Sequence, residues 1–144
     1  MTIKIRPTLK RSQWALPKHR FYELYHYCLQ YPEWVAEYNG MLGARAISYN
    51  SGGSGTPGHP TEAAGIRRSL LKDKIDLIES TARETDSQLA VYILKAVTMD
   101  GVTYSYLQTR DHIPCSRNMF YDRRRKFYWI LDQKLREGLI RPLT

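Results

Sequence analysis

A dense group of basic and polar side chains occupies residues 116–126, SRNMFYDRRRK, near the C-terminus. Arginine can donate two hydrogen bonds to the O6 and N7 atoms of guanine, and asparagine can pair in a similar way with adenine. Arginine and lysine also bind backbone phosphates and release counterions as they do so. The composition of this segment therefore indicates recognition of duplex DNA, in which some side chains read bases and others neutralise phosphates.

The spacing of apolar residues predicts a long helix through this segment, beginning at Ser116 or Cys115 because Pro114 disfavours helix at Ile113. The inner face is expected to contain Phe120, Phe127, Ile130, Leu131 and Leu135. The opposite face is expected to contain Arg117, Asn118, Tyr121, Arg124, Arg125 and Tyr128.

A shorter helix is predicted just before, capped by Thr103 and running from Tyr104 to about Arg110, with a break at 111–114. A short helix, a turn and a longer basic helix form the pattern of a helix-turn-helix, here over 103–135. The predicted DNA-binding residues are Ser116, Arg117, Asn118, Tyr121, Arg123, Arg124, Arg125 and Lys126.

These residues are expected to divide the work of binding. Arg117 and Asn118 lie at the start of the helix, where a recognition helix meets base edges. Residues 123–126 lie where phosphates flank the groove, and Tyr121 is expected to contact a thymine methyl group or a phosphate. Two alternatives stay open: a solvated charged helix face, and packing of the Arg123 stem beside the core.

The whole chain of 144 residues has 22 Lys and Arg against 14 Asp and Glu, a formal charge of +8. This excess favours a polyanion, either nucleic acid or an anionic membrane face. No run reaches the roughly 18 to 20 apolar residues of a membrane span, and no apolar stretch follows the N-terminal basic residues as in a signal peptide. A cytoplasmic protein is therefore expected.

The N-terminal third combines a basic segment with an aromatic helix. Residues 1–18 are predicted to be a flexible basic arm, or alternatively a solvated tail without a partner. A helix is expected from His19 to Tyr38 within an aromatic segment, 19–48, with Pro32 bending or breaking it near Gln30. The aromatic side chains on its remaining surface, Tyr22, Tyr27, Trp34 and Tyr38, are expected to pack on other helices or to form a platform for bases or a partner.

Residues 49–60 contain GGSGTPG and are predicted to be a flexible linker before a helical DNA-binding domain, 61–144. One helix is expected from Pro60–Thr61 to about Arg83, with a buried face of Ile66, Leu70, Ile75, Ile78 and Ala82. Thr85 and Gln88 match a capping box for the next helix, which Gly101 is expected to end. No segment alternates as a half-buried strand does, so the prediction is an all-α helical bundle.

Motifs for catalysis and for cofactors are missing from the sequence, so neither an enzyme nor a bound cofactor is expected. His26, Cys28, His112 and Cys115 are ligands of the type that zinc prefers. However, His26 and Cys28 diverge by about 200° on a helix and cannot readily bind the same metal ion, so no metal site is expected. The sequence has only two cysteines, outside any CxxC pairing, and a chain of this size needs no disulfide scaffold, so a reducing compartment fits.

The span 59–134 resembles the C-terminal half of phage-encoded transcriptional regulators of the RinA/ArpU kind, whose helix-turn-helix is similar to region four of bacterial sigma factors. The similarity is carried by TEAAGIRRSLLKDKIDLIESTA, LAVYILKAVTMDGVTYSYLQ and, most specifically, IPCSRNMFYDRRRKFYWILDQK. It implies an activator or repressor at phage late promoters that can touch host RNA polymerase. The aromatic N-terminal helix and its basic arm depart from the more acidic helix of that family.

Two functions from different classes follow. The first is a sequence-specific transcriptional regulator that could bind paired half-sites as a homodimer. The second is a protein-interaction module that binds RNA polymerase, a phage assembly component or a host nucleoprotein complex, as an anti-CRISPR protein does. Salt-dependent, sequence-selective duplex binding is expected of the first and not of the second.

Overall fold

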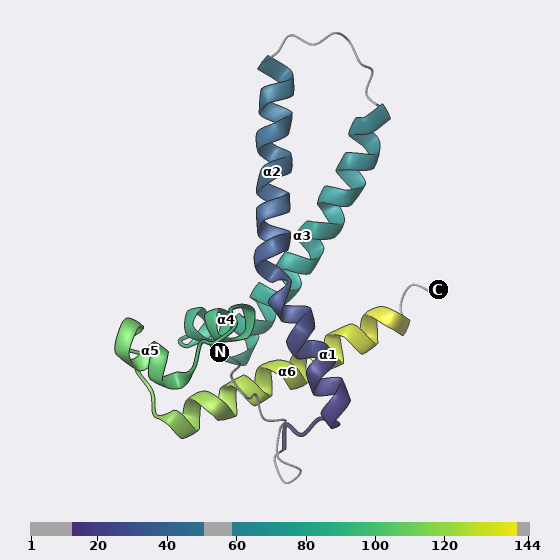
Figure 1. Cartoon of the computed structure of the whole chain (residues 1–144). Coiled ribbons are helices and arrows are strands. Elements are labelled where there is room, and N and C mark those ends of the chain that lie inside the picture. The colour runs from purple at the N-terminus through teal and green to yellow at the C-terminus, as the bar shows by residue number, and fades with distance from the viewer. Residues whose placement is uncertain (1–12, 51–58, 141–144) are drawn as a thin grey trace.

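The computed structural model of the protein describes residues 13–50 and 59–140, with side chains described for 13–41 and 62–138. These residues form helices without any strand, which confirms the predicted all-α bundle (Figure 1). The helices are α1 (Lys18–Leu29), α2 (Tyr31–Asn50), α3 (His59–Thr85), α4 (Ala90–Thr98), α5 (Tyr104–Asp111) and α6 (Arg117–Ile140).

The predicted break near Gln30 is confirmed, because Gln30 separates α1 from α2. Pro32 lies in the first turn of α2, where its missing N–H removes no helical hydrogen bond. The helix then continues to Asn50, well beyond Tyr38, and α3 begins at His59. The predicted linker bounds, 49–60, are therefore too wide; its centre, 51–58, lies outside the described residues.

The outer part of α3 corrects one predicted face. Figure 1 shows α2 and α3 side by side as an arm that rises away from the other helices. Along this arm α2 is the packing partner, with Arg67 donating to Glu37 and Arg68 donating to the hydroxyl of Tyr38. Ile66 and Leu70 face away from α2 and are 59% and 57% exposed, so their predicted burial is wrong.

The turn between α3 and α4 corrects the predicted capping box. Thr85 still belongs to α3, and its buried hydroxyl donates to the carbonyl oxygen of Thr81. Asp86 takes the capping role instead, because its carboxylate accepts hydrogen bonds from the backbone N–H groups of Gln88 and Leu89 at 3.0 and 3.1 Å. At the other end, α4 stops at Thr98 because Met99 is extended, so Gly101 does not end the helix as predicted; it adopts a φ of 82° in the turn that follows.

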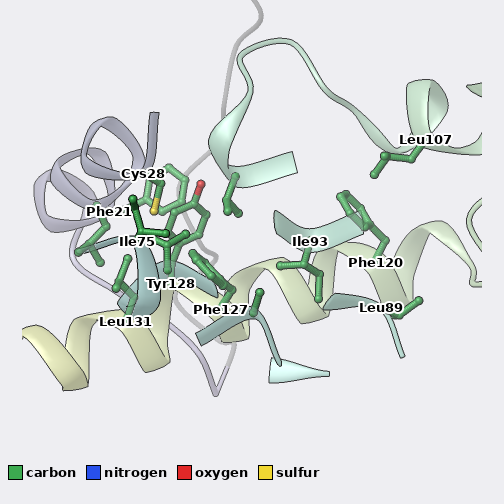
Figure 2. Packing of buried hydrophobic residues seen from close by; sticks show 14 of the residues in the cluster. Phe21, Cys28, Ile75, Leu89, Ile93, Leu107, Phe120, Phe127, Tyr128 and Leu131 are labelled. Carbon is green, nitrogen blue, oxygen red and sulfur yellow. The ribbon is translucent and has the colours of Figure 1, made fainter. Parts of the chain in front are cut away.

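One hydrophobic core joins the helices on both sides of 51–58. Figure 2 shows Phe21 and Cys28 of α1 beside Ile75 of α3 and Tyr128 of α6. Toward the other end of α6 the core continues through other buried side chains, Leu89, Ile93, Leu107 and Phe120. The aromatic N-terminal segment is thus part of the bundle, and its side chains Tyr22, Tyr27, Trp34 and Tyr38 pack as core or against it.

The last residues of the predicted basic arm belong to the folded body. Leu16 is buried, and the ring of Trp14 lies 5.3 Å from that of Trp129 on α6 in an edge-to-face contact. Burial of these two apolar side chains ties 13–17 to the bundle before Lys18 opens α1. The prediction of a flexible arm is therefore wrong for 13–18, and 1–12 lie outside the described residues.

Candidate nucleic-acid interface

The start and end of α5 follow the local signals in the sequence. The side-chain oxygen of Thr103 accepts a hydrogen bond from the backbone N–H of Tyr106 at 3.2 Å, which confirms Thr103 as the cap. At the other end His112 adopts the left-handed conformation with a φ of 52°, and its N–H donates to the carbonyl oxygen of Leu107. The helix therefore stops sharply and the chain turns toward α6.

The start of α6 also agrees with the prediction. Ser116 precedes the helix, and its hydroxyl oxygen accepts a hydrogen bond from the backbone N–H of Met119 at 3.2 Å. Ser116 is exposed, so its described role is that of a helix cap at the surface. A short helix, a turn of 112–116 and a longer helix follow one another in the predicted order.

A small set of buried side chains holds α5 against the beginning of α6. Leu107 and Phe120 are fully buried, and Tyr104 and Ile113 are each 6% exposed. The ring of Tyr104 lies 5.8 Å from that of Phe120, and its hydroxyl donates to the carbonyl oxygen of Cys115 at 2.5 Å. The first turn of α6 therefore has a fixed position relative to α5.

The two predicted base readers project from this first turn. Arg117 and Asn118 are both exposed. The guanidinium carbon of Arg117 lies 5.2 Å from the ring centre of Tyr104, and Nη2 donates to the hydroxyl of Ser105 at 3.3 Å. In the described part of the chain the side chain of Asn118 has no hydrogen bond, so its amide faces solvent.

Arg123 differs from the other predicted DNA-binding residues because its guanidinium is hydrogen-bonded to two carboxylates. Its guanidinium donates to Asp86 at 3.1 Å and to Asp122 at 2.7 Å. Burial alone would raise the pKa of Asp86, but hydrogen bonds from Arg123 and from the backbone N–H groups of Leu89 and Gln88 hold that pKa below its ordinary value. Arg123 thus connects α6 to the turn before α4, in line with the alternative of packing beside the core.

Arg124 lies among tyrosines. Its guanidinium carbon is 5.8 Å from the ring centre of Tyr121 and 5.9 Å from that of Tyr128, and the Tyr121 ring itself packs edge-to-face on Phe120. Arg124 and Tyr121 are half-buried. An aromatic face attracts a cation without supplying a counter-charge, so these contacts differ from the carboxylate contacts of Arg123.

Arg125 and Lys126 complete the basic run. Both are half-buried, and the Nε atom of Arg125 is occluded without a hydrogen-bond partner in the described residues. The ammonium group of Lys126 lies 5.6 Å from the ring centre of Trp14. Neither side chain forms an ion pair with a described carboxylate, which sets both apart from Arg123.

The buried face of α6 is rotated from the predicted one. Tyr128, expected on the outer face, is 1% exposed, whereas Ile130 and Leu135 are half-buried. The reason is α1, which packs on that side: Phe21 lies 5.2 Å from the Tyr128 ring, and Arg20 donates to the buried carboxylate of Asp132 at 2.6 Å.

Tyr104, Ser105 and Asp86 are the residues of this region that the sequence did not single out. Tyr104 directly follows the Thr103 cap, a signal for its position but not for its contact with Arg117. Asp86 precedes Arg123 by 37 positions, and a separation of that length leaves no periodic pattern. Ser105 carries no signal at all in the sequence.

The geometry of the described residues does not favour reactive cysteines or a metal site. Burial raises the pKa of the Cys28 thiol, and burial together with nearby Asp86 raises that of Cys115, so both cysteines stay protonated. Among the described residues no three His, Cys, Asp or Glu side chains are grouped to hold a metal ion. No described helix is both long and apolar enough to cross a membrane.

Comparison of the chain with protein-family models, with curated proteins and with solved structures finds no match. The resemblance to RinA/ArpU regulators therefore stays a prediction from the sequence.

Proposed function

We propose that the chain is a non-enzymatic, sequence-specific DNA-binding protein that regulates transcription, with α5 and α6 acting as a helix-turn-helix. One observation carries the proposal. Within 117–126, Arg117, Arg124, Arg125 and Lys126 form no ion pair with any described carboxylate, and Arg123 alone does. The other unpaired cations are spread over α1, α3 and α5: Lys18, Arg68, Lys74, Arg83 and Arg110. A concentrated unpaired charge on one helix suits a polyanion.

The first turn of α6 supplies the base contacts in this proposal. Arg117 and Asn118 are exposed and have the hydrogen-bonding groups that read guanine and adenine in the major groove. Further along the helix, α1 covers Tyr128 and Asp132, which keeps that part of α6 away from a duplex. The base-reading surface in this proposal is therefore confined to the start of α6.

Phosphate contacts come from the residues that follow. Arg124, Arg125 and Lys126 are half-buried and form no ion pair with a described carboxylate, and each contact with a phosphate adds affinity without sequence information. Arg123 contributes to the fold instead, since Asp86 and Asp122 already take its hydrogen bonds. A short reading surface binds weakly alone, so a homodimer on two half-sites and contact with host RNA polymerase, in the cytoplasm of a bacterial host, belong to the proposal.

A binding selection from random duplex DNA, with the purified full chain at moderate and at high salt, tests the proposal. Recovery of a defined motif, with affinity that falls as salt rises, is the expected result. Binding that is weak, blind to sequence and abolished by salt would overturn sequence-specific recognition.

The exposure of Ile66 and Leu70 favours a second candidate, a protein-interaction module. These aliphatic side chains lie one helical turn apart on the α2–α3 arm, away from the body that carries α5 and α6. A partner in this case is RNA polymerase, a phage assembly component or a host nucleoprotein complex. Replacing Ile66 and Leu70 by Ser should leave duplex binding intact if the first candidate holds and abolish partner binding if the second does.

A further inference from the structure

The contacts of Arg117 extend from α6 back to α5. The ring of Tyr104 faces its guanidinium at 5.2 Å, and the hydroxyl of Ser105 accepts a hydrogen bond from Nη2 at 3.3 Å. Both partners are consecutive residues at the start of α5, directly after the Thr103 cap. An exposed arginine on a first helical turn ordinarily samples many rotamers, so two contacts from another helix are a specific restraint.

The restraining residues are themselves fixed. Tyr104 is 6% exposed, packs against Phe120, and donates its hydroxyl proton to the carbonyl oxygen of Cys115 in the turn. The Tyr104 side chain of α5 therefore contacts the turn through Cys115 and α6 through Phe120 and Arg117. Ser105 is exposed, and its only described side-chain contact is the one with Arg117.

We infer that Tyr104 and Ser105 are positioning residues that preorganise Arg117 to read a guanine. The inference rests on the proposed function and deepens it, because it states how one base contact becomes selective. The Tyr104 ring holds the guanidinium carbon of Arg117 over its face at 5.2 Å, and the guanidinium can still donate two hydrogen bonds to the O6 and N7 atoms of guanine. Ser105 occupies one proton of Nη2 and leaves the second proton of that nitrogen for the base.

The decisive variant is Ser105→Ala, because an exposed serine can be removed without disturbing the core. Its matched control is Ser69→Ala, an exposed serine on the α2–α3 arm. We expect Ser105→Ala to reduce discrimination between the selected duplex and one with the read guanine replaced by roughly two- to tenfold, the range for ordering one flexible side chain. Ser69→Ala should leave discrimination unchanged.

A double-mutant cycle separates positioning from a merely structural effect. In the Arg117→Ala background, Ser105→Ala should cause no further loss of discrimination, because no guanidinium is left to position. Tyr104→Phe keeps the ring and removes the hydroxyl; it should retain more discrimination than Tyr104→Leu, whose thermal stability must be measured alongside. Additive losses in the cycle would overturn the inference.

A measurement on the free protein makes failure of the inference distinguishable from failure of the proposed function. Nitrogen-15 relaxation of the Arg117 Nε–H group should report an ordered side chain that becomes mobile in Ser105→Ala. If the wild-type chain selects a motif and Ser105→Ala changes neither the order nor the discrimination, the inference is wrong and the function stands. If Arg117 is ordered as described and no duplex is selected, the function is wrong and with it the guanine-reading role.

Discussion

The two halves of α6 treat their cations differently. In the C-terminal half, Lys134 pairs with Glu84 of α3, and Arg136 pairs with the buried Asp132 at 3.0 Å. In the N-terminal half, 117–126, three cations lie against aromatic rings instead: Arg117 on Tyr104, Arg124 on Tyr121 and Tyr128, and Lys126 on Trp14. Apart from Arg123, which pairs with Asp86 and Asp122, the cations of 117–126 thus have no described carboxylate partner, whereas Lys134 and Arg136 of the C-terminal half each have one.

This difference explains how one helix can serve both the fold and a ligand. A carboxylate partner cancels the field of a cation, whereas an aromatic face attracts the cation and leaves its net charge intact. The C-terminal half therefore contributes to cohesion of the bundle, and the N-terminal half is suited to a polyanion. Substitutions in the two halves should have separable effects, on stability in one and on DNA binding in the other.

Among the substitutions that test this comparison, Asp132→Ala is expected to have the largest effect, on the stability of the fold. Asp132 accepts hydrogen bonds from the half-buried Arg20 and the exposed Arg136. Loss of the first should lower the free energy of unfolding by about 1.5 to 3 kcal/mol, the value of one hydrogen bond to a charged group, and loss of the solvent-screened second should add less. Chemical denaturation measures this loss. The motif chosen by the folded variant should stay the same; a changed motif would mean that the C-terminal half also reads DNA.

Base reading should be the next largest effect. Arg117→Ala or Asn118→Ala should each remove about 1 to 3 kcal/mol of discrimination at one base pair, because each deletes one bidentate contact. Competition binding with duplexes that differ at single positions measures the change. Equal weakening on every duplex would contradict a reading role for these residues.

The salt dependence of DNA affinity tests the comparison through substitutions that remove one positive charge from either half of α6. Arg125→Gln and Lys126→Gln in the N-terminal half should each make the slope of log affinity against log salt shallower by about 0.9, because each substitution removes one phosphate contact. Lys134→Gln removes the same charge from the C-terminal half, where Glu84 pairs with it. Its slope in an anisotropy titration should stay at the wild-type value, and an equal drop in all three variants would show that only net charge matters.

The smallest effect concerns Asp86, the partner of Arg123. Because the folded-state pKa of Asp86 lies below its ordinary value, its contribution to stability is present above that ordinary value and is lost as pH falls through the folded pKa. Asp86→Asn should therefore flatten the fall in stability below about pH 4, since 3.8 is the ordinary value. Asp73→Asn, at an exposed position, is the control for acid denaturation and should behave as wild type.

Local signals made much of the fold predictable. Thr103 and Ser116 cap helices as expected, Gly101 takes a positive φ in the turn after α4, and Gln30 divides the first helical segment, because each outcome depends on residues within a few positions. Faces that depend on distant partners were predicted less well. Tyr128 is buried because α1 lies against it, and Ile66 is exposed because α2 covers a different side of α3.

The features of the candidate site also divide into local ones, which the sequence predicts, and ones that depend on distant partners. The run of cations and the start of α6 were visible in the sequence. The distinction between Arg123 and its neighbours was not, since it depends on Asp86, which chain folding brings within 3.1 Å. The support of Arg117 by Tyr104 and Ser105 likewise requires the angle between α5 and α6, which no spacing along the chain specifies.

The most direct test of a DNA-binding N-terminal half of α6 is a nitrogen-15 chemical-shift titration of the full chain with duplex DNA. Our account predicts that the largest changes fall on 116–126 and on the side-chain nitrogens of Arg117 and Asn118, with little change over 130–138 or around Ile66 and Leu70. Changes centred on Ile66 and Leu70, or no changes at saturating duplex, would contradict it.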